Sequence, residues 1–111
     1  MEYKKCFTTY IHRPGAADLL QWMCAQGFFE APASMKHHGA EPGGLARHSI
    51  NVFHRLAFIA AEAIKPPQIF EIETLAVCGL LHDLCKIDAY KEALEGASRR
   101  YVLTKNFPAG H

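Results

Sequence analysis

Apolar residues recur at helical spacing along most of the chain, which predicts a mostly helical protein. Residues 16–26 form one such stretch, and Gly27 suits the left-handed position that follows a helix end. Residues 45–64 form the longest stretch, and two prolines follow it. The apolar face of this longest helix is predicted to contain Val52, Leu56, Ile59, Ala60 and Ala63.

Two histidines fall on predicted apolar faces. His48 precedes Val52 by four residues, which places it on the same face, in the first turn of the helix. A further helix is predicted over residues 70–84, with Glu73 in its first turn, where a carboxylate favours the positive end of the helix dipole. The apolar stripe of this helix places His82 in line with Leu75, Cys78 and Cys85. A histidine on the inner face of each of two helices is how a bundle builds a metal site.

The remaining segments are less regular. Residues 1–13 show too mixed a pattern to assign, and residues 30–44 form a loop rich in proline and glycine. Residues 90–94 are predicted to form one or two helical turns. Residues 99–105 favour a strand, as part of a short hairpin or an extended arm. The predicted fold is a single mostly α domain over residues 1–111 with a small β element near its C-terminus.

Composition narrows the function classes only slightly. A chain of 111 residues allows one domain, and half of its residues are apolar or aromatic. Lys and Arg total 12 against 11 Asp and Glu, so no global charge favours nucleic acid or an anionic membrane. No apolar run reaches the ~20 residues that span a bilayer, and no signal peptide is apparent. We therefore expect no membrane partner.

The four cysteines are widely spaced and favour reduced thiols over a disulfide framework. This spacing predicts a cytoplasmic protein. Cys78 and Cys85 fall in an apolar stretch and are predicted to pack in the core, as is Trp22 on the first predicted helix.

The residues that suggest chemistry are His82, Asp83 and Lys86, with His48 upstream. Two imidazoles and a carboxylate offer nitrogen and oxygen ligands, a set that suits Mn²⁺, Fe²⁺, Ni²⁺, Co²⁺ or Zn²⁺ better than Ca²⁺. Lys86 follows His82 by one helical turn and could place its charge beside a phosphate. The simpler alternative is a core histidine next to an acid that ends a helix.

These residues lie in a longer pattern. Residues 43–49 (GGLARHS) and 80–87 (LLHDLCKI), with residues 107–111 (FPAGH), resemble the HD superfamily of metal-dependent phosphohydrolases. The similarity is greatest to the HD domain of bacterial 3′→5′ exoribonucleases and to small HD proteins of phages and gut bacteria. It extends over about residues 35–111 and implies an HD-like helical bundle.

The resemblance implies a role for each matching position. His48, His82 and Asp83 match metal ligands, and His111 matches a histidine at or near the metal. Lys86 matches a lysine that contacts phosphate, and together with Asp83 it is the expected catalytic pair. The expected substrate-binding residues are Lys86 and, outside the motif, His37, His38 and Arg99. Arg99 belongs to a small basic and aromatic cluster that could hold a phosphate backbone.

The expected activity is hydrolysis of a phosphate ester in a nucleotide or nucleic acid, with metal-activated water as nucleophile. The chain departs from the family pattern at Cys85, where many relatives have glycine. It also ends at His111, before the family's last aspartate ligand and its later helices. We therefore expect a partial metal site, exposed apolar surface on the helix of His48, and a homo-oligomer. The alternative is a non-catalytic, truncated HD fold that serves as a binding or assembly module, and the sequence could also be a fragment of a longer protein.

Overall fold

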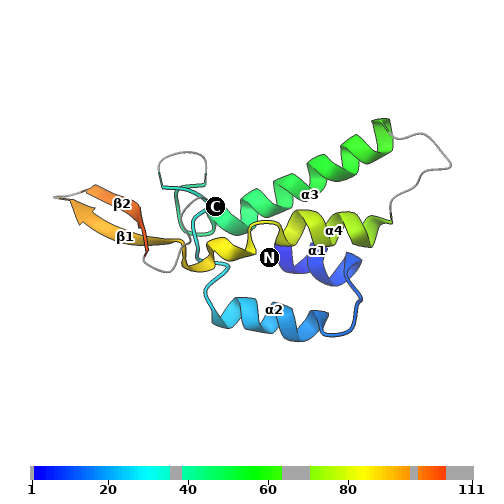
Figure 1. The fold of residues 1–111 in the computed structure, drawn as a ribbon, viewed down its shortest axis with the longest axis horizontal. Helices are drawn as coiled ribbons and strands as arrows, with labels where there is room; N and C mark the ends of the chain where they lie inside the picture. The colour runs from blue at the N-terminus through cyan, green and yellow to red at the C-terminus, as the bar shows by residue number, and fades with distance from the viewer. Residues whose placement is uncertain (1, 36–38, 64–70, 96–97, 105–111) are drawn as a thin grey trace.

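The computed structural model of the protein describes residues 2–35, 39–63, 71–95 and 98–104. In these residues, helices dominate and two strands lie near the C-terminus (Figure 1). This confirms the predicted mostly helical fold with a small β element, while the HD identity of the bundle stays a prediction. In chain order the elements are α1 (Glu2–Tyr10), α2 (Ala16–Ala25), α3 (Gly44–Ala63), α4 (Ile72–Leu81), the 3₁₀ helix η1 (Leu84–Asp88), β1 (Tyr90–Glu95) and β2 (Ser98–Leu103).

The structure confirms helices α2 and α3. Gly27 follows α2 with a φ of +87°, the left-handed conformation predicted for it. Helix α4 is shorter than predicted, because it ends at Leu81 rather than at residue 84. Asp83 has φ −111° and ψ 25°, which breaks the α-helical path before η1 begins. The predicted helix is therefore divided at the His-Asp pair.

Two segments differ from the prediction. Residues 1–13, for which the sequence predicts no element, contain α1. Its Tyr3 and Phe7 and the following Ile11 recur every four residues and are all buried. Residues 90–94, predicted as helical turns, belong to β1, which pairs antiparallel with β2 so that Tyr90 lies opposite Leu103. The partner strand satisfies the backbone hydrogen bonds of β1, and this long-range pairing outweighs local helical preference.

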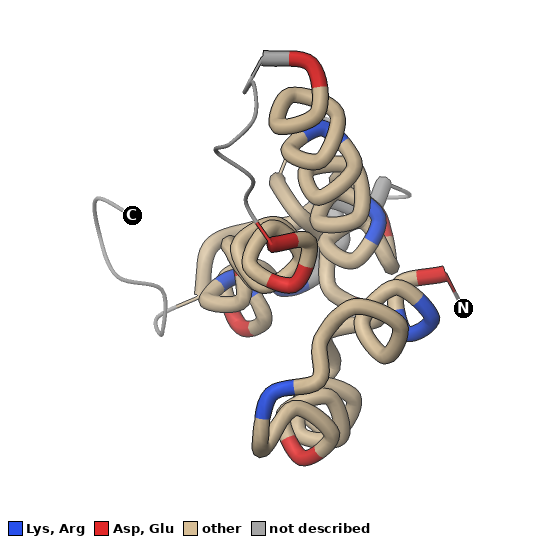
Figure 2. Tube along the Cα trace, turned by 90° about the vertical axis from the view of Figure 1, so that its right-hand side faces the viewer, with Lys and Arg blue, Asp and Glu red and all other residues tan. Residues whose placement is uncertain are grey.

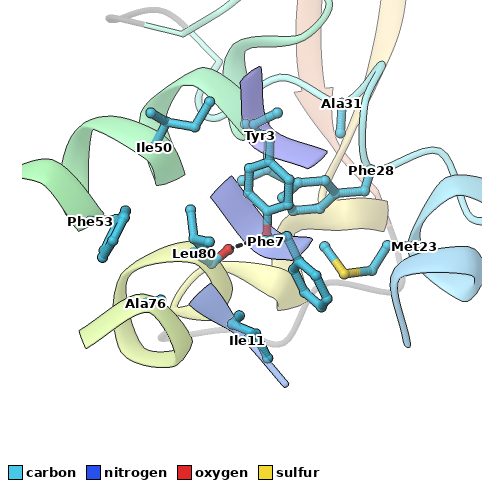
Figure 3. Packing of buried hydrophobic residues seen from close by; sticks show 12 residues of the cluster. Tyr3, Phe7, Ile11, Met23, Phe28, Ala31, Ile50, Phe53, Ala76 and Leu80 are labelled. Atoms are coloured by element: carbon cyan, nitrogen blue, oxygen red, sulfur yellow. Dashed lines mark hydrogen bonds between the residues drawn. The ribbon is translucent and has the colours of Figure 1, made fainter. Parts of the chain in front are cut away.

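The core lies between α1, α3 and α4, and Met23 of α2 and Phe28 after it add further buried side chains (Figure 3). The ring of Tyr3 lies 4.9 Å from that of Phe28, centroid to centroid. The Tyr3 hydroxyl donates a 2.6 Å hydrogen bond to the carbonyl oxygen of Leu80. Helix α1, for which no prediction was made, therefore supplies the centre of the core.

The buried face of α3 is rotated from the predicted one. Its buried residues are Leu45, Ala46, Ser49, Ile50 and Phe53. Val52 and Leu56 are only half-buried, and Ile59 is 47% exposed. The prediction was wrong because α3 packs against both α1 and α4, so the face that it buries depends on where those two helices lie.

The expected core positions of Trp22, Cys78 and Cys85 are also wrong. Trp22 is 49% exposed, and both cysteines are exposed. Helix α4 turns Ala76, Gly79 and Leu80 inward, so Cys78 points the other way. Because α4 is apolar on most of its faces, its sequence alone does not indicate which face is buried.

None of the described helices is long and apolar enough to cross a membrane. Lys and Arg positions are scattered over several elements and interleaved with Asp and Glu, rather than gathered on one face (Figure 2). This agrees with the balanced charge of the sequence.

Candidate metal centre

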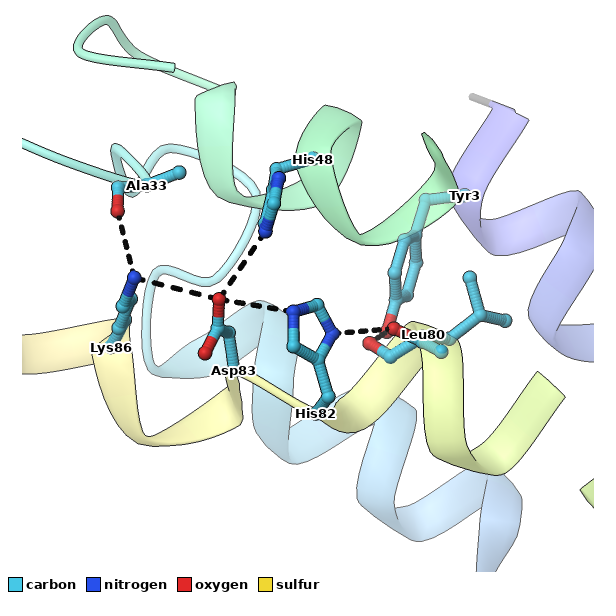
Figure 4. Close-up of polar contacts among 8 residues, drawn as sticks. Tyr3, Ala33, His48, Leu80, His82, Asp83 and Lys86 are labelled. Carbon is cyan, nitrogen blue, oxygen red and sulfur yellow. Dashed lines mark hydrogen bonds and ion pairs between the residues drawn. The ribbon is translucent and has the colours of Figure 1, made fainter. Parts of the chain in front are cut away.

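The side chains of His48, His82 and Asp83 meet at one end of the α3–α4 pair (Figure 4). His48 projects from the first turns of α3, while His82 and Asp83 occupy the break between α4 and η1. Their candidate ligand atoms all lie within 4.8 Å of one another. The Nε2 atoms of His48 and His82 lie 3.4 Å and 3.1 Å from the same oxygen, Asp83 Oδ2. The break in the helix thus turns two adjacent residues toward one point.

A backbone carbonyl fixes the tautomer of His82. Its Nδ1 lies 2.8 Å from the carbonyl oxygen of Gly79, one turn earlier in α4. Because a carbonyl oxygen only accepts, Nδ1 carries the proton and donates it. Nε2 is then the ring nitrogen that faces Asp83, and in a metal-bound state it would supply the lone pair to the ion.

Lys86 lies on the other side of the same carboxylate. Its Nζ is 3.5 Å from Asp83 Oδ2 and donates a 3.2 Å hydrogen bond to the carbonyl oxygen of Ala33. Ala33 is held in turn by a hydrogen bond from its N–H to the carbonyl oxygen of Gly39, at 2.8 Å. A Cβ added to Gly39 would lie 2.8 Å from the Ala33 Cβ, so the loop packs closely here.

The exposed fraction of the side chains is smallest at the carboxylate of Asp83 and largest at His48. The side chain of Asp83 is 13% exposed and that of Lys86 20%, against 31% for His82 and 44% for His48. His48 was predicted to be on a buried face, but it lies at the rim of the site instead. The acid therefore lies at the bottom of an open site whose histidine side a solvent-borne ligand can reach.

Partial burial lowers the pKa of His48, and the positive charge of Lys86 and the ring of His82 act in the same direction. The attraction of Asp83 opposes them but does not outweigh them. The neutral imidazole, which has the lone pair that a metal needs, is therefore favoured at neutral pH.

A close helix crossing sets the distance between the two halves of the site. At Gly79, an added Cβ would lie 2.6 Å from the Cα of Phe53 on α3. Only glycine allows α3 and α4 to approach so closely at this point. The same residue also provides the carbonyl that orients His82.

The described part of the chain does not test the other predicted site residues. His37, His38 and His111 lie outside the described residues. Arg99 lies in β2, opposite Leu94, and the structure does not describe its side chain. His54 is exposed on α3, away from the candidate ligands.

Three groups at or near the site were not predicted. The carbonyl oxygens of Ala33 and Gly79 have no sequence signal, because every residue has a carbonyl. Ser49 is fully buried beside His48, and its hydroxyl has no hydrogen-bond partner within the part of the chain that the structure describes. The close approach at Gly79 had a weak signal, an isolated glycine within a helical pattern.

No family model, curated protein or solved structure matches this chain. The donor atoms of the site indicate which ligand it can bind. Two imidazole nitrogens and one carboxylate oxygen fit a first-row transition ion, and the contact of His82 Nδ1 with the Gly79 carbonyl leaves Nε2 facing the other candidate ligands. His48, His82 and Asp83 are the residues that could hold it.

Proposed function

We propose that the protein is a divalent-metal-dependent phosphohydrolase of the HD type, acting on the phosphate ester of a nucleotide or nucleic acid. One observation carries the proposal: two imidazole nitrogens and one ammonium group lie within 3.5 Å of a single oxygen, Asp83 Oδ2. A simple ion pair with Asp83 would need only one of these three partners, so the convergence of all three favours a binding site. The nucleotide part of the proposal rests on the sequence pattern of residues 43–49 and 80–87.

In this proposal, three residues bind the metal and a fourth binds the phosphate. His48, His82 and Asp83 would hold an Mn, Fe, Ni, Co or Zn ion, which supplies Lewis acidity toward a phosphoryl oxygen and activates water for attack. Lys86 stands beside the carboxylate as a point charge that neutralises the negative charge of a bound phosphate. Its bond to Ala33 holds the ammonium group in place before substrate arrives.

We also propose that the protein forms a homo-oligomer and acts in the cytoplasm. Phe58 is 63% exposed and its neighbour Ile59 47%, and large apolar side chains exposed together favour burial against another surface. This is the apolar surface expected on the helix of His48. The cysteines at positions 6, 24, 78 and 85 are free thiols, the state that a reducing cytoplasm maintains.

Metal analysis combined with a turnover assay tests the function. Protein reconstituted with Mn²⁺ or Ni²⁺ is freed of excess ion, and its metal content is measured by mass spectrometry. We expect His82→Ala to lower metal affinity by at least about 100-fold, since loss of an outer-shell partner alone costs roughly 10–100-fold. His54→Ala, an exposed histidine on the same helix as His48, is the matched control and should keep the metal.

Turnover is followed with p-nitrophenyl phosphate and bis(p-nitrophenyl) phosphate. Lys86→Met keeps most of the aliphatic stem without the charge, so it should retain metal while turnover falls by about 100-fold. Reconstituted wild type without bound metal would refute the proposal. Tight metal with no turnover would instead favour the non-catalytic binding module.

A further inference from the structure

A pocket lies near the metal centre, at the base of the β-hairpin formed by β1 and β2. It has a volume of about 310 Å³, at the lower end of the range for small-molecule sites. Two tyrosines and two prolines contribute to its wall, together with one acid and one aliphatic side chain. These residues are Glu30, Pro32, Pro42, Ile87, Tyr90 and Tyr101.

Two residues of the pocket wall are direct chain neighbours of the Lys86–Ala33 contact at the metal centre. Pro32 precedes Ala33, whose carbonyl holds Lys86, and Ile87 follows Lys86 directly. The hydrogen bond between Lys86 and Ala33 thus joins the two chain segments that continue into the pocket wall. The same wall is tied to α3, because the N–H of Leu45 donates a 2.9 Å hydrogen bond to the carbonyl oxygen of Ala31. The pocket therefore lies next to the backbone that positions Lys86.

The hairpin register explains why two tyrosines reach this pocket. Tyr90 lies opposite Leu103, and Tyr101 lies opposite Glu92, two residues further along β1. Side chains two residues apart on a strand, and those directly opposite on its partner, share one face of the sheet. Tyr90 and Tyr101 are therefore diagonal neighbours on the face that lines the pocket. Aromatic rings beside proline rings form a surface suited to stacking a flat heterocycle.

Glu30 adds a polar group to this apolar surface. Its backbone is held on both sides, because its N–H donates to the Gly27 carbonyl at 3.2 Å and its own carbonyl accepts from the Gly43 N–H at 3.3 Å. The exposed carboxylate can only accept hydrogen bonds. It thus favours a ring that carries an N–H donor over one that carries only acceptors.

We infer that this pocket is a base subsite, which takes the nucleobase of a mononucleotide bearing an exocyclic amino group while its phosphate lies at Lys86 and the metal centre. The inference deepens the proposed function and rests on it for the position of the phosphate. The stacking surface and the acceptor are independent of any metal. A nucleoside, which lacks the phosphate, therefore tests the pocket alone.

The experiment is an NMR titration of the metal-free, full-length protein with adenosine and with purine riboside, which has the same ring system without the amino group. We expect adenosine to shift backbone signals around the pocket and to bind about three-fold or more tightly than purine riboside. Glu30→Ala should remove that difference. Tyr101→Ala should weaken adenosine binding by about ten-fold, and Tyr101→Phe should restore most of it.

Leu103→Ala is the matched control, because Leu103 is an exposed apolar residue on the same face of the same strand, outside the pocket wall. Its affinity for adenosine should equal that of the wild type, which shows that Tyr101→Ala acts through the ring and not through the hairpin. Absence of adenosine binding, or equal binding by wild type and Tyr101→Ala, overturns the inference. If turnover of p-nitrophenyl phosphate persists in that case, the proposed function survives. Adenosine binding at Tyr101 in a protein that never takes up metal supports the subsite and refutes the proposed function.

Discussion

At the scale of single residues, backbone carbonyls organise the candidate site as much as its side chains do. The carbonyl of Gly79 sets the tautomer of His82, and that of Ala33 holds the ammonium group of Lys86. A third carbonyl, that of Leu80, accepts the Tyr3 hydroxyl two residues before His82. These contacts hold the end of α4 in place without using the Nε2 atoms of the two histidines or the carboxylate of Asp83.

The Tyr3 hydrogen bond leads to a prediction about stability. Burial raises the pKa of Tyr3 far above its usual value, so its hydroxyl stays a donor at any ordinary pH. Tyr3→Phe removes that donor from a buried carbonyl and should lower the free energy of unfolding by about 1–3 kcal/mol. Urea denaturation of the metal-free protein at pH 7 measures the change.

Tyr10→Phe is the control for this variant, since Tyr10 lies on the same helix but is only partly buried. It should change the free energy of unfolding by no more than about 0.5 kcal/mol. A Tyr3→Phe protein as stable as the wild type would show that the hydrogen bond contributes nothing.

At the scale of elements, the site depends on how closely α3 and α4 cross. His48 comes from one helix and the His-Asp pair from the end of the other, so their separation follows the crossing at Gly79 and Phe53. Sequence patterns predicted both helices. They did not predict which face of α3 would be buried, because that depends on where α4 and the unexpected α1 pack.

Gly79→Ala tests the crossing. The added methyl group would force the helices apart, and we expect a cost of about 1–3 kcal/mol, partly offset by the better helix propensity of alanine. Because His48 moves with α3, metal affinity should also fall by about 10-fold or more, and calorimetric titration with Mn²⁺ measures this. Cys78→Ala, an exposed change at the preceding position, should leave the affinity unchanged. Metal binding of wild-type strength in Gly79→Ala would show that the crossing distance does not control the site.

At the scale of the whole molecule, Glu73 ties together segments some 60 positions apart. The N–H of His12 donates a 2.6 Å hydrogen bond to one of its oxygens, and Arg13 Nε lies 3.3 Å from the other. The turn between α1 and α2 is thereby joined to the start of α4. The sequence explained Glu73 only by the dipole of its own helix, and it identified no partner for His12.

This contact predicts how stability depends on pH. The hydrogen bond from the His12 N–H, followed by that from Arg13, lowers the pKa of Glu73 below its usual 4.5. The stabilisation is therefore fully present above pH 4.5 and is lost as the pH falls through the lowered value. In thermal unfolding, wild type should melt higher than Glu73→Gln at pH 7, and the difference should shrink toward zero near pH 3. Glu71→Gln, which removes the same charge at an exposed position two residues away, should show a smaller difference from wild type. A pH-independent difference for Glu73→Gln would contradict the prediction.

The sequence by itself determined what is encoded locally. Apolar periodicity was sufficient for α2 and α3, the β-favouring residues for β2, and the spacing around His48, His82 and Asp83 for the candidate ligands, which the structure brings together. The helices and the strand depend on residues close in the chain, whereas the ligand set combines two short motifs, one around His48 and one around His82 and Asp83. The roles of His37, His38 and His111 stay predictions, because those residues lie outside the described part of the chain.

The tertiary structure alone decided which surfaces meet. It placed α1 in the core, paired β1 with β2, and left Trp22 and Cys78 exposed although both are apolar enough to be buried. It also selected the carbonyls of Ala33 and Gly79 from many chemically identical ones. The physical reason is the same in each case: burial and strand pairing depend on contacts between segments distant in sequence, and local pattern contains no information about the partner.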